Sequence, residues 1–379
     1  MKRTATIRAA AAASLVASVG LGIVTAGAAG ASPRDHEGHA LFAETDAASG
    51  NSVISYLRAP DGTVSYAHTY LTGGLGATAT GASADPLASQ GGLALIDGGR
   101  ELVATNPGSN TVTLFSVEGA RLVWRQQIAS GGLFPNSVTS RGDLVTVLNS
   151  GGTGAVSEFR LDDHRLIPLA GQTRSLGLTN TVPPFFLQGA GQVGYTPDGS
   201  HLVVTTKHST DSFEVFSVAR DGDLGASPVV TAAHTPVPFA FNFDGAGNLV
   251  AVEALNSTVS TYRVNGDGTL SWIGSVGDGA HALCWISSAG GYFFGDNAGS
   301  ATVSSFSEGV GATPVLVNAV AATAHAGTTD STTSPDGKFL YVESGGAGTI
   351  DVYSISGATL TNVETLSNLP VASEGLVAS

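Results

Sequence analysis

Six side chains that can donate, accept or transfer protons stand at equivalent places in the sequence, nine or ten residues before an aromatic residue. They are Asn106, Asn149, Lys207, Glu253, Asn297 and Glu343. Lys207 and Glu253 are the pair suited to acid–base chemistry, because a buried amine and carboxylate can perturb each other's protonation. The same two side chains could instead form a structural ion pair, and the sequence leaves both interpretations open.

A second polar set precedes short turns such as Pro197-Asp198-Gly199, and it comprises Asn136, Gln188, Gln192, His281 and Asp330. His281 could act as an acid or a base, because imidazole titrates near neutral pH. A structural histidine in the channel wall is the alternative. For Asp330 the alternative is a structural role, in which it caps a turn with Ser331 and Thr332. Our prediction is that catalysis uses Lys207, Glu253 and His281, and that the substrate-binding residues are Asn106, Asn136, Asn149, Gln188, Gln192, Asp330 and Glu343.

A strand pattern that recurs seven times accounts for this spacing. Each copy begins with a small or polar residue, continues with alternating side chains and carries an aromatic residue at its sixth position. The copies are NSVISYLR (51–58), NTVTLFSV (110–117), GAVSEFRL (154–161), DSFEVFSV (211–218), STVSTYRV (257–264), ATVSSFSE (301–308) and GTIDVYSI (348–355). Short alternating segments predict β-strands. We expect the seven aromatic residues to pack in the core.

Turns and further apolar segments surround each copy. Pro-Asp-Gly or Gly-containing turns precede strand-like runs such as HLVVTT (201–206) and KFLYVE (338–343), and another short apolar segment precedes each turn. Four short strands repeated seven times predict an all-β fold, a seven-bladed β-propeller. The first unit begins at its second strand (39–44), and EGLVAS (374–379) belongs to no complete unit. We therefore predict that the C-terminal strand pairs into blade one and closes the ring.

Composition limits which partners and which covalent links the protein can have. The 379 residues include 51 Gly, 16 Lys and Arg, and 30 Asp and Glu, for a formal net charge of −14. This excess of acidic residues repels phosphate and excludes a nucleic-acid partner. Cys284 is the single cysteine, so no internal disulfide can form, and we expect it to be buried as a small apolar residue.

The N-terminus has the features of an export signal. Lys2, Arg3 and Arg8 lead into a small and apolar stretch at 9–29, followed by an Ala-x-Ala sequence ending at Ala31. This pattern predicts a signal peptide over 1–31 and one secreted propeller domain over 32–379. An uncleaved membrane anchor is the alternative. After cleavage we expect no membrane association, and we expect a monomer.

Propeller geometry predicts where the polar residues meet. The ends of second strands and the starts of innermost strands lie on one face, around the mouth of the central channel. Both polar sets therefore surround this mouth, which is where a propeller binds or converts a ligand. We expect a small-molecule ligand, with no cofactor and no metal.

The sequence resembles the lactonase-family β-propellers, which include 6-phosphogluconolactonases and 3-carboxy-cis,cis-muconate lactonizing enzymes. The resemblance rests on QVGYTPDGSHLVVTTKHSTDSFEVFSV (192–218), VAVEALNSTVSTYRV (250–264), SPDGKFLYVESGGAGTIDVYSI (334–355) and LPVASEGLVAS (369–379). It covers the whole length after the predicted signal peptide. It implies the same propeller fold and, for its catalytic members, a lactone substrate.

The resemblance also assigns roles to particular positions. Glu253, followed by Ala254-Leu255-Asn256-Ser257, matches the glutamate of the catalytic members, and Lys207 matches a basic residue that the family often has. The family's Arg-His pair is replaced by Val237 and Pro238, and the histidine of the preceding blade falls near Gly191-Gln192. A phosphorylated or tricarboxylate substrate needs a fixed cationic clamp. Because the arginine and histidine of the family are replaced here, the resemblance favours a neutral lactone as the substrate over a phosphorylated or tricarboxylate one.

Two main functions follow as expectations. In the first, an exported lactonase or lactonizing cyclase opens or closes a neutral lactone, with Glu253 as general base and Lys207 or His281 polarising the carbonyl. In the second, a non-catalytic propeller binds a small ligand, a glycan or a protein on the same face. A quinone-dependent sugar dehydrogenase fits less well, because the predicted mouth lacks the arginines and histidines of such propellers.

Overall fold

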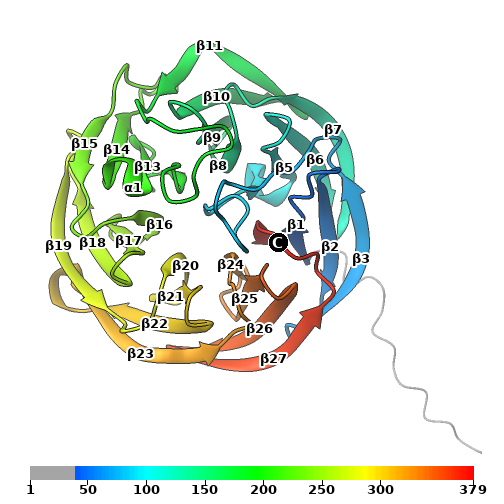
Figure 1. Cartoon of the computed structure of the whole chain (residues 1–379), viewed down its shortest axis with the longest axis vertical. Coiled ribbons are helices and arrows are strands. Elements are labelled where there is room, and N and C mark those ends of the chain that lie inside the picture. Colours follow the sequence, from blue (N-terminus) through cyan, green and yellow to red (C-terminus); the bar gives the residue numbers. More distant parts are fainter. Residues whose placement is uncertain (1–38) are drawn as a thin grey trace, which may run out of the picture. The chain divides into compact units, whose positions relative to one another are not determined.

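Seven four-stranded antiparallel sheets are arranged as the blades of a propeller around a central channel (Figure 1). The computed structural model describes residues 39–379, so the predicted signal peptide over 1–31 lies outside the described residues. The prediction of an all-β, seven-bladed propeller is confirmed. None of the helices in the described range is long and apolar enough to cross a membrane.

The first four blades follow the chain, with the innermost strand named first. Blade one contains β28 (Leu376–Ala378), β1 (Ala40–Glu44), β2 (Ser52–Arg58) and β3 (Val64–Leu71). Blade two contains β4 (Leu93–Ile96), β5 (Glu101–Asn106), β6 (Thr111–Glu118) and β7 (Arg121–Ala129), with the short 3-10 helix η2 (Asp97–Gly99). Blade three contains β8 (Pro135–Arg141), β9 (Leu144–Asn149), β10 (Ala155–Asp162) and β11 (Arg165–Ser175). Blade four contains β12 (Val193–Tyr195), β13 (His201–Thr205), β14 (Ser212–Ser217) and β15 (Val229–Ala232), with the one-turn helix α1 (Lys207–Thr210).

The last three blades repeat the arrangement. Blade five contains β16 (Pro238–Phe243), β17 (Leu249–Glu253), β18 (Thr258–Val264) and β19 (Leu270–Gly277). Blade six contains β20 (Leu283–Ala289), β21 (Tyr292–Asn297), β22 (Thr302–Glu308) and β23 (Pro314–Thr323), with the 3-10 helix η3 (Val310–Ala312). Blade seven contains β24 (Asp330–Thr333), β25 (Phe339–Ser344), β26 (Thr349–Ser356) and β27 (Thr359–Ser367).

Blade one joins the two ends of the propeller. β28 pairs antiparallel with β1, with Leu376 opposite Ala43 and Ala378 opposite Leu41. The guanidinium of Arg58 donates a further hydrogen bond to the carbonyl oxygen of Ser379, at 2.9 Å. The predicted closure by the C-terminal strand is confirmed, and it leaves no unpaired edge on the channel side of β1.

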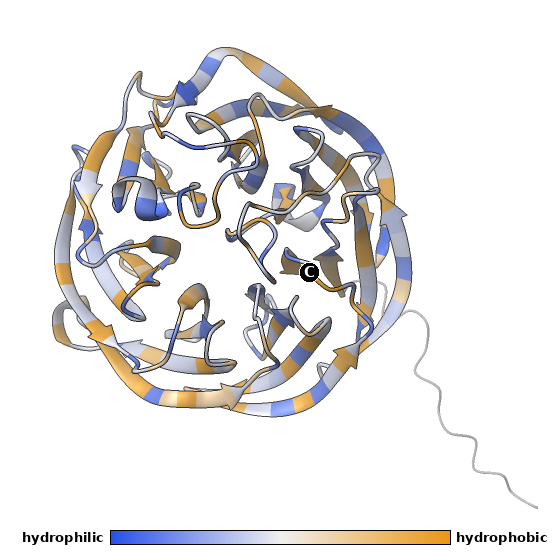
Figure 2. Ribbon diagram, in the orientation of Figure 1, coloured by the Kyte–Doolittle hydropathy of each residue, from blue (hydrophilic) through white to orange (hydrophobic). Residues whose placement is uncertain are grey.

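The core lies between neighbouring blades. Along the strands hydrophobic and hydrophilic residues alternate, as Figure 2 shows, because successive side chains of a strand point to opposite faces. The recurring aromatic residues are all buried, as predicted: Tyr56, Phe115, Phe159, Phe216, Tyr262, Phe306 and Tyr353. Gly199 and Gly337, which end two Pro-Asp-Gly turns, both have φ of 69°, a conformation that favours glycine.

Candidate functional site

The predicted mouth of the channel is covered by the chain itself. The connection between β3 and β4 (72–92, light blue in Figure 1) extends across the ring to its centre. Ser89 Oγ donates to the carbonyl oxygen of Asn136 in blade three at 2.6 Å, and Trp285 Nε1 in blade six donates to the carbonyl oxygen of Ser89 at 2.8 Å. Segment 85–91 of this connection, which we call the plug, therefore links blades on different sides of the channel.

Lys207 holds the plug from blade four. It is the first residue of α1 rather than the last of β13, and only 1% of its surface is exposed. Its Nζ donates to the main-chain carbonyl oxygens of Ala88 and Phe186, both at 2.5 Å, and lies 5.1 Å from the centre of the Phe239 ring. Burial lowers the pKa of Lys207 to about 8, although the charges of Asp85 and Glu374 oppose that shift.

A carboxyl group next to blade one holds the plug from the other side. Glu374, just before β28, accepts hydrogen bonds from the main-chain N–H groups of Leu87, Ala88 and Ser89, at 2.6, 3.2 and 2.9 Å. Burial, followed by the neighbouring charge of Asp85, raises the pKa of Glu374 well above its ordinary value. Burial raises the pKa of Asp85 as well, although the neighbouring Glu374 side chain and the charge of Lys207 oppose that shift. Protonation of one of these two buried carboxyl groups removes the charge repulsion between them.

The predicted asparagines are buried in contacts within the protein. Asn136 Nδ2 donates to the carbonyl oxygens of Leu87 and Ala190, so it also supports the plug. Asn106 accepts from Asn51 and Thr72 and donates to Thr113. Asn149 donates to the carbonyl oxygens of Ser130 and Val147.

Glu253 lies at the end of β17 and is fully buried. Its carboxylate accepts hydrogen bonds from the main-chain N–H groups of His234 and Thr235, at 3.1 and 3.2 Å, and from nearby hydroxyl groups. These hydroxyl groups belong to Thr235, Thr258, Ser260 and Tyr262. The carboxylate thus points toward β18 and ties the connection between β15 and β16 to blade five. It shares no hydrogen-bond partner with Lys207.

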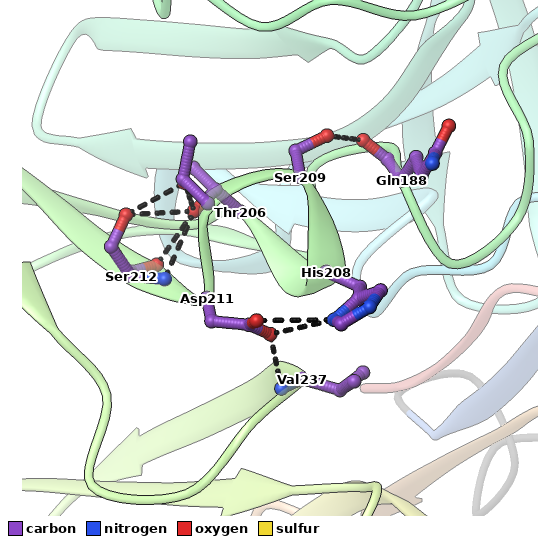
Figure 3. A network of polar contacts seen from close by, with 8 residues as sticks. Gln188, Thr206, His208, Ser209, Asp211, Ser212 and Val237 are labelled. Carbon is purple, nitrogen blue, oxygen red and sulfur yellow. Dashed lines mark hydrogen bonds and ion pairs between the residues drawn. The ribbon is translucent and has the colours of Figure 1, made fainter.

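Two predicted residues are exposed, and Figure 3 shows the surroundings of one of them. Gln188 lies in the connection before β12, and its carbonyl oxygen accepts a hydrogen bond from Ser209 of α1. In the same network the carboxylate of Asp211 accepts a hydrogen bond from the main-chain N–H of Val237, at 2.9 Å. Val237 is the residue that stands where the resembled family has its arginine, and its N–H is therefore not free to bind a ligand. His281 lies before β20, and its main-chain N–H donates to Ser300 Oγ at 2.9 Å.

On the far side of the plug, the channel contains a polar cavity of about 220 Å³. It is lined by Gln90, Gly91, Leu93, Gln192, Asn242, Ser287, Ser288, Asp330, Ser331, Thr332, Thr333, Leu376 and Val377. Gln192 exchanges hydrogen bonds with the main chain of Phe241, and Gln90 does the same with Ile286. The amide of Gln90 thus connects the plug to blade six, and that of Gln192 connects the start of blade four to blade five. The lining includes no lysine, arginine or histidine.

Asp330 is the ionisable side chain in that lining, and it is 2% exposed. It accepts the main-chain N–H of Ser331 at 2.8 Å and that of Leu376 at 2.9 Å. Burial raises the pKa of Asp330 to about 7, and the charge of Asp85 adds to the shift. Glu343 lies opposite Asp330 across β24 and β25, and burial, followed by the charge of Asp330, raises the pKa of Glu343. Of the predicted ring, the structure therefore brings Gln192, Asp330 and Glu343 close to one cavity.

Other buried carboxyl groups lie near the channel. Burial raises the pKa values of Glu44, Asp46 and Asp296 well above their ordinary range. Within residues 39–379, no three His, Cys, Asp or Glu side chains gather closely enough to hold a metal ion. Cys284 is partly buried against a hydrophobic cluster, and burial raises the pKa of its thiol, so the thiol is neutral.

The sequence analysis did not identify Asp85, Gln90 or Glu374. The sequence does contain one signal for Asp85 and Gln90. Along the chain, Tyr56 and Phe115 are separated by more residues than any other two consecutive members of the recurring aromatic set. The extra residues in this interval form the long connection between β3 and β4, which contains the plug. Glu374 had no such signal, since its partners lie 285 to 287 positions away in the chain.

Comparison with known proteins supports the fold. No protein-family model and no curated protein matches the sequence. Among solved structures, a candidate 6-phosphogluconolactonase of Bacteroides fragilis has a TM-score of 0.70 at 18% identity, covering 92% of this chain and 100% of its own. The periplasmic gluconolactonase of Pseudomonas aeruginosa has a TM-score of 0.69 at 17% identity, covering 90% and 98%. The chain has the propeller fold of these lactonases. At this identity the likeness shows the fold alone.

Proposed function

We propose that the protein takes a small neutral lactone into the channel cavity and hydrolyses it, with Asp330 as the general base. The observation behind this proposal is a carboxyl group with a pKa of about 7 in the wall of a polar cavity. A general base works best when its pKa lies near the operating pH. Lactonases with the same fold are consistent with this chemistry.

The lining favours a neutral substrate. A phosphorylated sugar lactone would need a cationic partner, and the lining supplies hydroxyl and amide groups instead. Asn242 and Ser288 are partly exposed members of this lining, and Asn242 Nδ2 donates to the carbonyl oxygen of Ile286 at 2.8 Å. Such groups suit the hydroxyl groups of an uncharged ring.

In the proposed reaction, the carboxylate of Asp330 accepts a proton from water while the water oxygen bonds to the lactone carbonyl carbon. The ring C–O bond then breaks, and the proton on Asp330 passes to the departing ring oxygen. One water is consumed, and the product is a hydroxy acid. The earlier assignment of catalysis to Glu253, Lys207 and His281 stays a prediction that turnover assays can test.

A second candidate, ligand binding without turnover, is favoured by the contacts of Asp330. Both of its oxygens already accept main-chain N–H groups, from Ser331 and Leu376. Such bonds stabilise the carboxylate and reduce its tendency to accept a proton. Under this second candidate, the cavity binds the same neutral ligand but does not hydrolyse it.

The two candidates differ in a turnover assay with uncharged five- and six-membered lactones. For hydrolysis, we expect kcat/KM to rise with pH through about 7, because Asp330 must be deprotonated. Asp330→Asn should lower kcat by a factor of about 100 or more. The matched control is Glu214→Gln, which alters a buried carboxyl group of β14 outside the lining. Binding without turnover would support the second candidate, and full activity in Asp330→Asn would refute the role of Asp330.

We also propose that the protein is exported and acts as a monomer with this small ligand as its partner. Support for export comes from the basic and apolar residues at 1–31 and from the periplasmic location of one protein with the same fold. N-terminal sequencing of the protein recovered from the culture medium or cell envelope should begin at Ser32. Recovery of the uncleaved chain would contradict this.

A further inference from the structure

A groove lies between blade one and the connection that leaves blade seven. It has a volume of about 540 Å³, within the range of about 300–1,000 Å³ that is usual for small-molecule sites. It is lined by Thr45, Ala47, Gly50, Ser52, Ile54, Tyr56, Tyr66, Thr69, Ser367, Asn368 and Pro370. None of these residues is charged, although the chain has a net charge of −14.

One face of blade one forms the floor and a wall of the groove. Ile54 lies opposite Thr69, and Tyr56 lies opposite Tyr66, across β2 and β3. Positions 66 and 69 would face opposite sides of a regular strand, because side chains alternate. A register shift between Ser55 and Tyr56 brings both to the same side. The shift in strand pairing is therefore what places both Tyr66 and Thr69 in the lining of the groove.

Tyr66 presents its ring to solvent. It is 63% exposed, while Tyr56 beneath it is 7% exposed. Trp272 occupies the equivalent position of blade five, opposite Tyr262, but His234 stacks on its indole with the ring centres 4.1 Å apart. Within the described residues, no aromatic ring stacks on Tyr66. The face of Tyr66 is thus available to a ligand.

We propose that this groove binds a neutral saccharide, with one sugar ring packed on Tyr66. The C–H face of a sugar is apolar and its edge carries hydroxyl groups, which matches a tyrosine beside hydroxyl and amide side chains. Thr69, Ser367 and Asn368 are exposed at the rim and supply these polar groups. An anionic or cationic ligand finds no charged partner in the lining. The saccharide site is separate from the channel cavity and does not depend on the proposed lactone chemistry.

Calorimetric titration of the full protein with chitotetraose and maltotetraose tests the proposal. We expect saturable binding of at least one of them, weakened at least tenfold by Tyr66→Ala and largely kept by Tyr66→Phe, which retains the ring. Trp272→Ala is the matched control, because it removes an exposed aromatic residue at the equivalent position of another blade. This variant should bind as the unmodified protein does.

Three results would overturn the proposal. These are the absence of binding to both oligosaccharides at millimolar concentration, unchanged binding in a folded Tyr66→Ala variant, and equal weakening by Trp272→Ala. Lactone turnover in the Tyr66→Ala variant should equal that of the unmodified protein. Loss of saccharide binding with turnover intact would therefore separate this site from the channel cavity.

Discussion

Lys207 Nζ lies 2.5 Å from the main-chain carbonyl oxygen of Ala88, although 119 positions separate the two residues in the chain. This bond joins a buried amine of blade four to the plug that covers the channel mouth. Glu374 binds the N–H groups of the same segment from the opposite side. The mouth is therefore held closed by side chains that recognise the protein's own main chain.

Replacing Lys207 should loosen the plug. Lys207→Met removes the donor to two buried carbonyl oxygens, and we expect the free energy of unfolding to fall by about 3 kcal/mol. Urea denaturation measures this loss. Lys338→Met, which alters an exposed lysine paired only with Asp336, should change stability by less than about 0.5 kcal/mol. Equal stability of the two variants would show that the plug does not depend on Lys207.

Replacing Glu253 should affect stability more than chemistry. Glu253→Gln puts an amide donor where the carboxylate accepts from several donors, so we expect a loss of about 2 kcal/mol or more in unfolding free energy. Turnover per folded molecule should stay within threefold of the unmodified protein. Glu118→Gln, at an exposed glutamate, is the stability control. Loss of turnover in fully folded Glu253→Gln would establish Glu253 as a catalytic residue.

The C-terminal strand should be essential for closure. Leu376 is 2% exposed and belongs to a hydrophobic cluster shared by blades one and seven, so Leu376→Ala should cost about 2–5 kcal/mol. Deletion of residues 371–379 should prevent cooperative folding altogether, because it removes β28 and Glu374. Thermal unfolding followed by circular dichroism measures both effects. Val371→Ala, at a residue 70% exposed in the same connection, should unfold like the unmodified protein.

Stability should fall as the pH rises from 5 to 7. Burial raises the pKa of Asp330, Glu158 and Glu214 to about 7, above their values in the unfolded chain. In this pH range the folded protein retains protons that the unfolded chain has lost. Each group therefore contributes stability at low pH that is lost as the pH rises toward 7, at most about 1.4 kcal/mol per pH unit.

Urea denaturation at pH 5, 6 and 7 checks this sign, and Glu158→Gln should reduce the slope. Glu118→Gln again provides an exposed control. Unfolding free energies that increase from pH 5 to pH 7 would contradict the prediction. They would mean that these buried carboxyl groups are ionised in the folded protein.

The sequence by itself determined the blades and their closure. Alternating side chains, turn residues and the aromatic residue at a fixed position are local features, and local features repeat when the structure repeats. The position of EGLVAS (374–379) outside any complete unit was enough to predict that it pairs with β1. Even the burial of Tyr56 and its six equivalents followed from the repeat.

Only the tertiary structure decided which polar residues face a cavity. The end of β17 could be located from the repeat, but the direction of the Glu253 carboxylate, toward β18, depends on donors in two other segments. The plug has no periodic pattern, and its path over the mouth depends on partners in distant blades, Lys207 and Trp285 among them. Asp330 has its raised pKa because neighbouring blades exclude water from it, and such burial comes from the assembled ring rather than from adjacent residues.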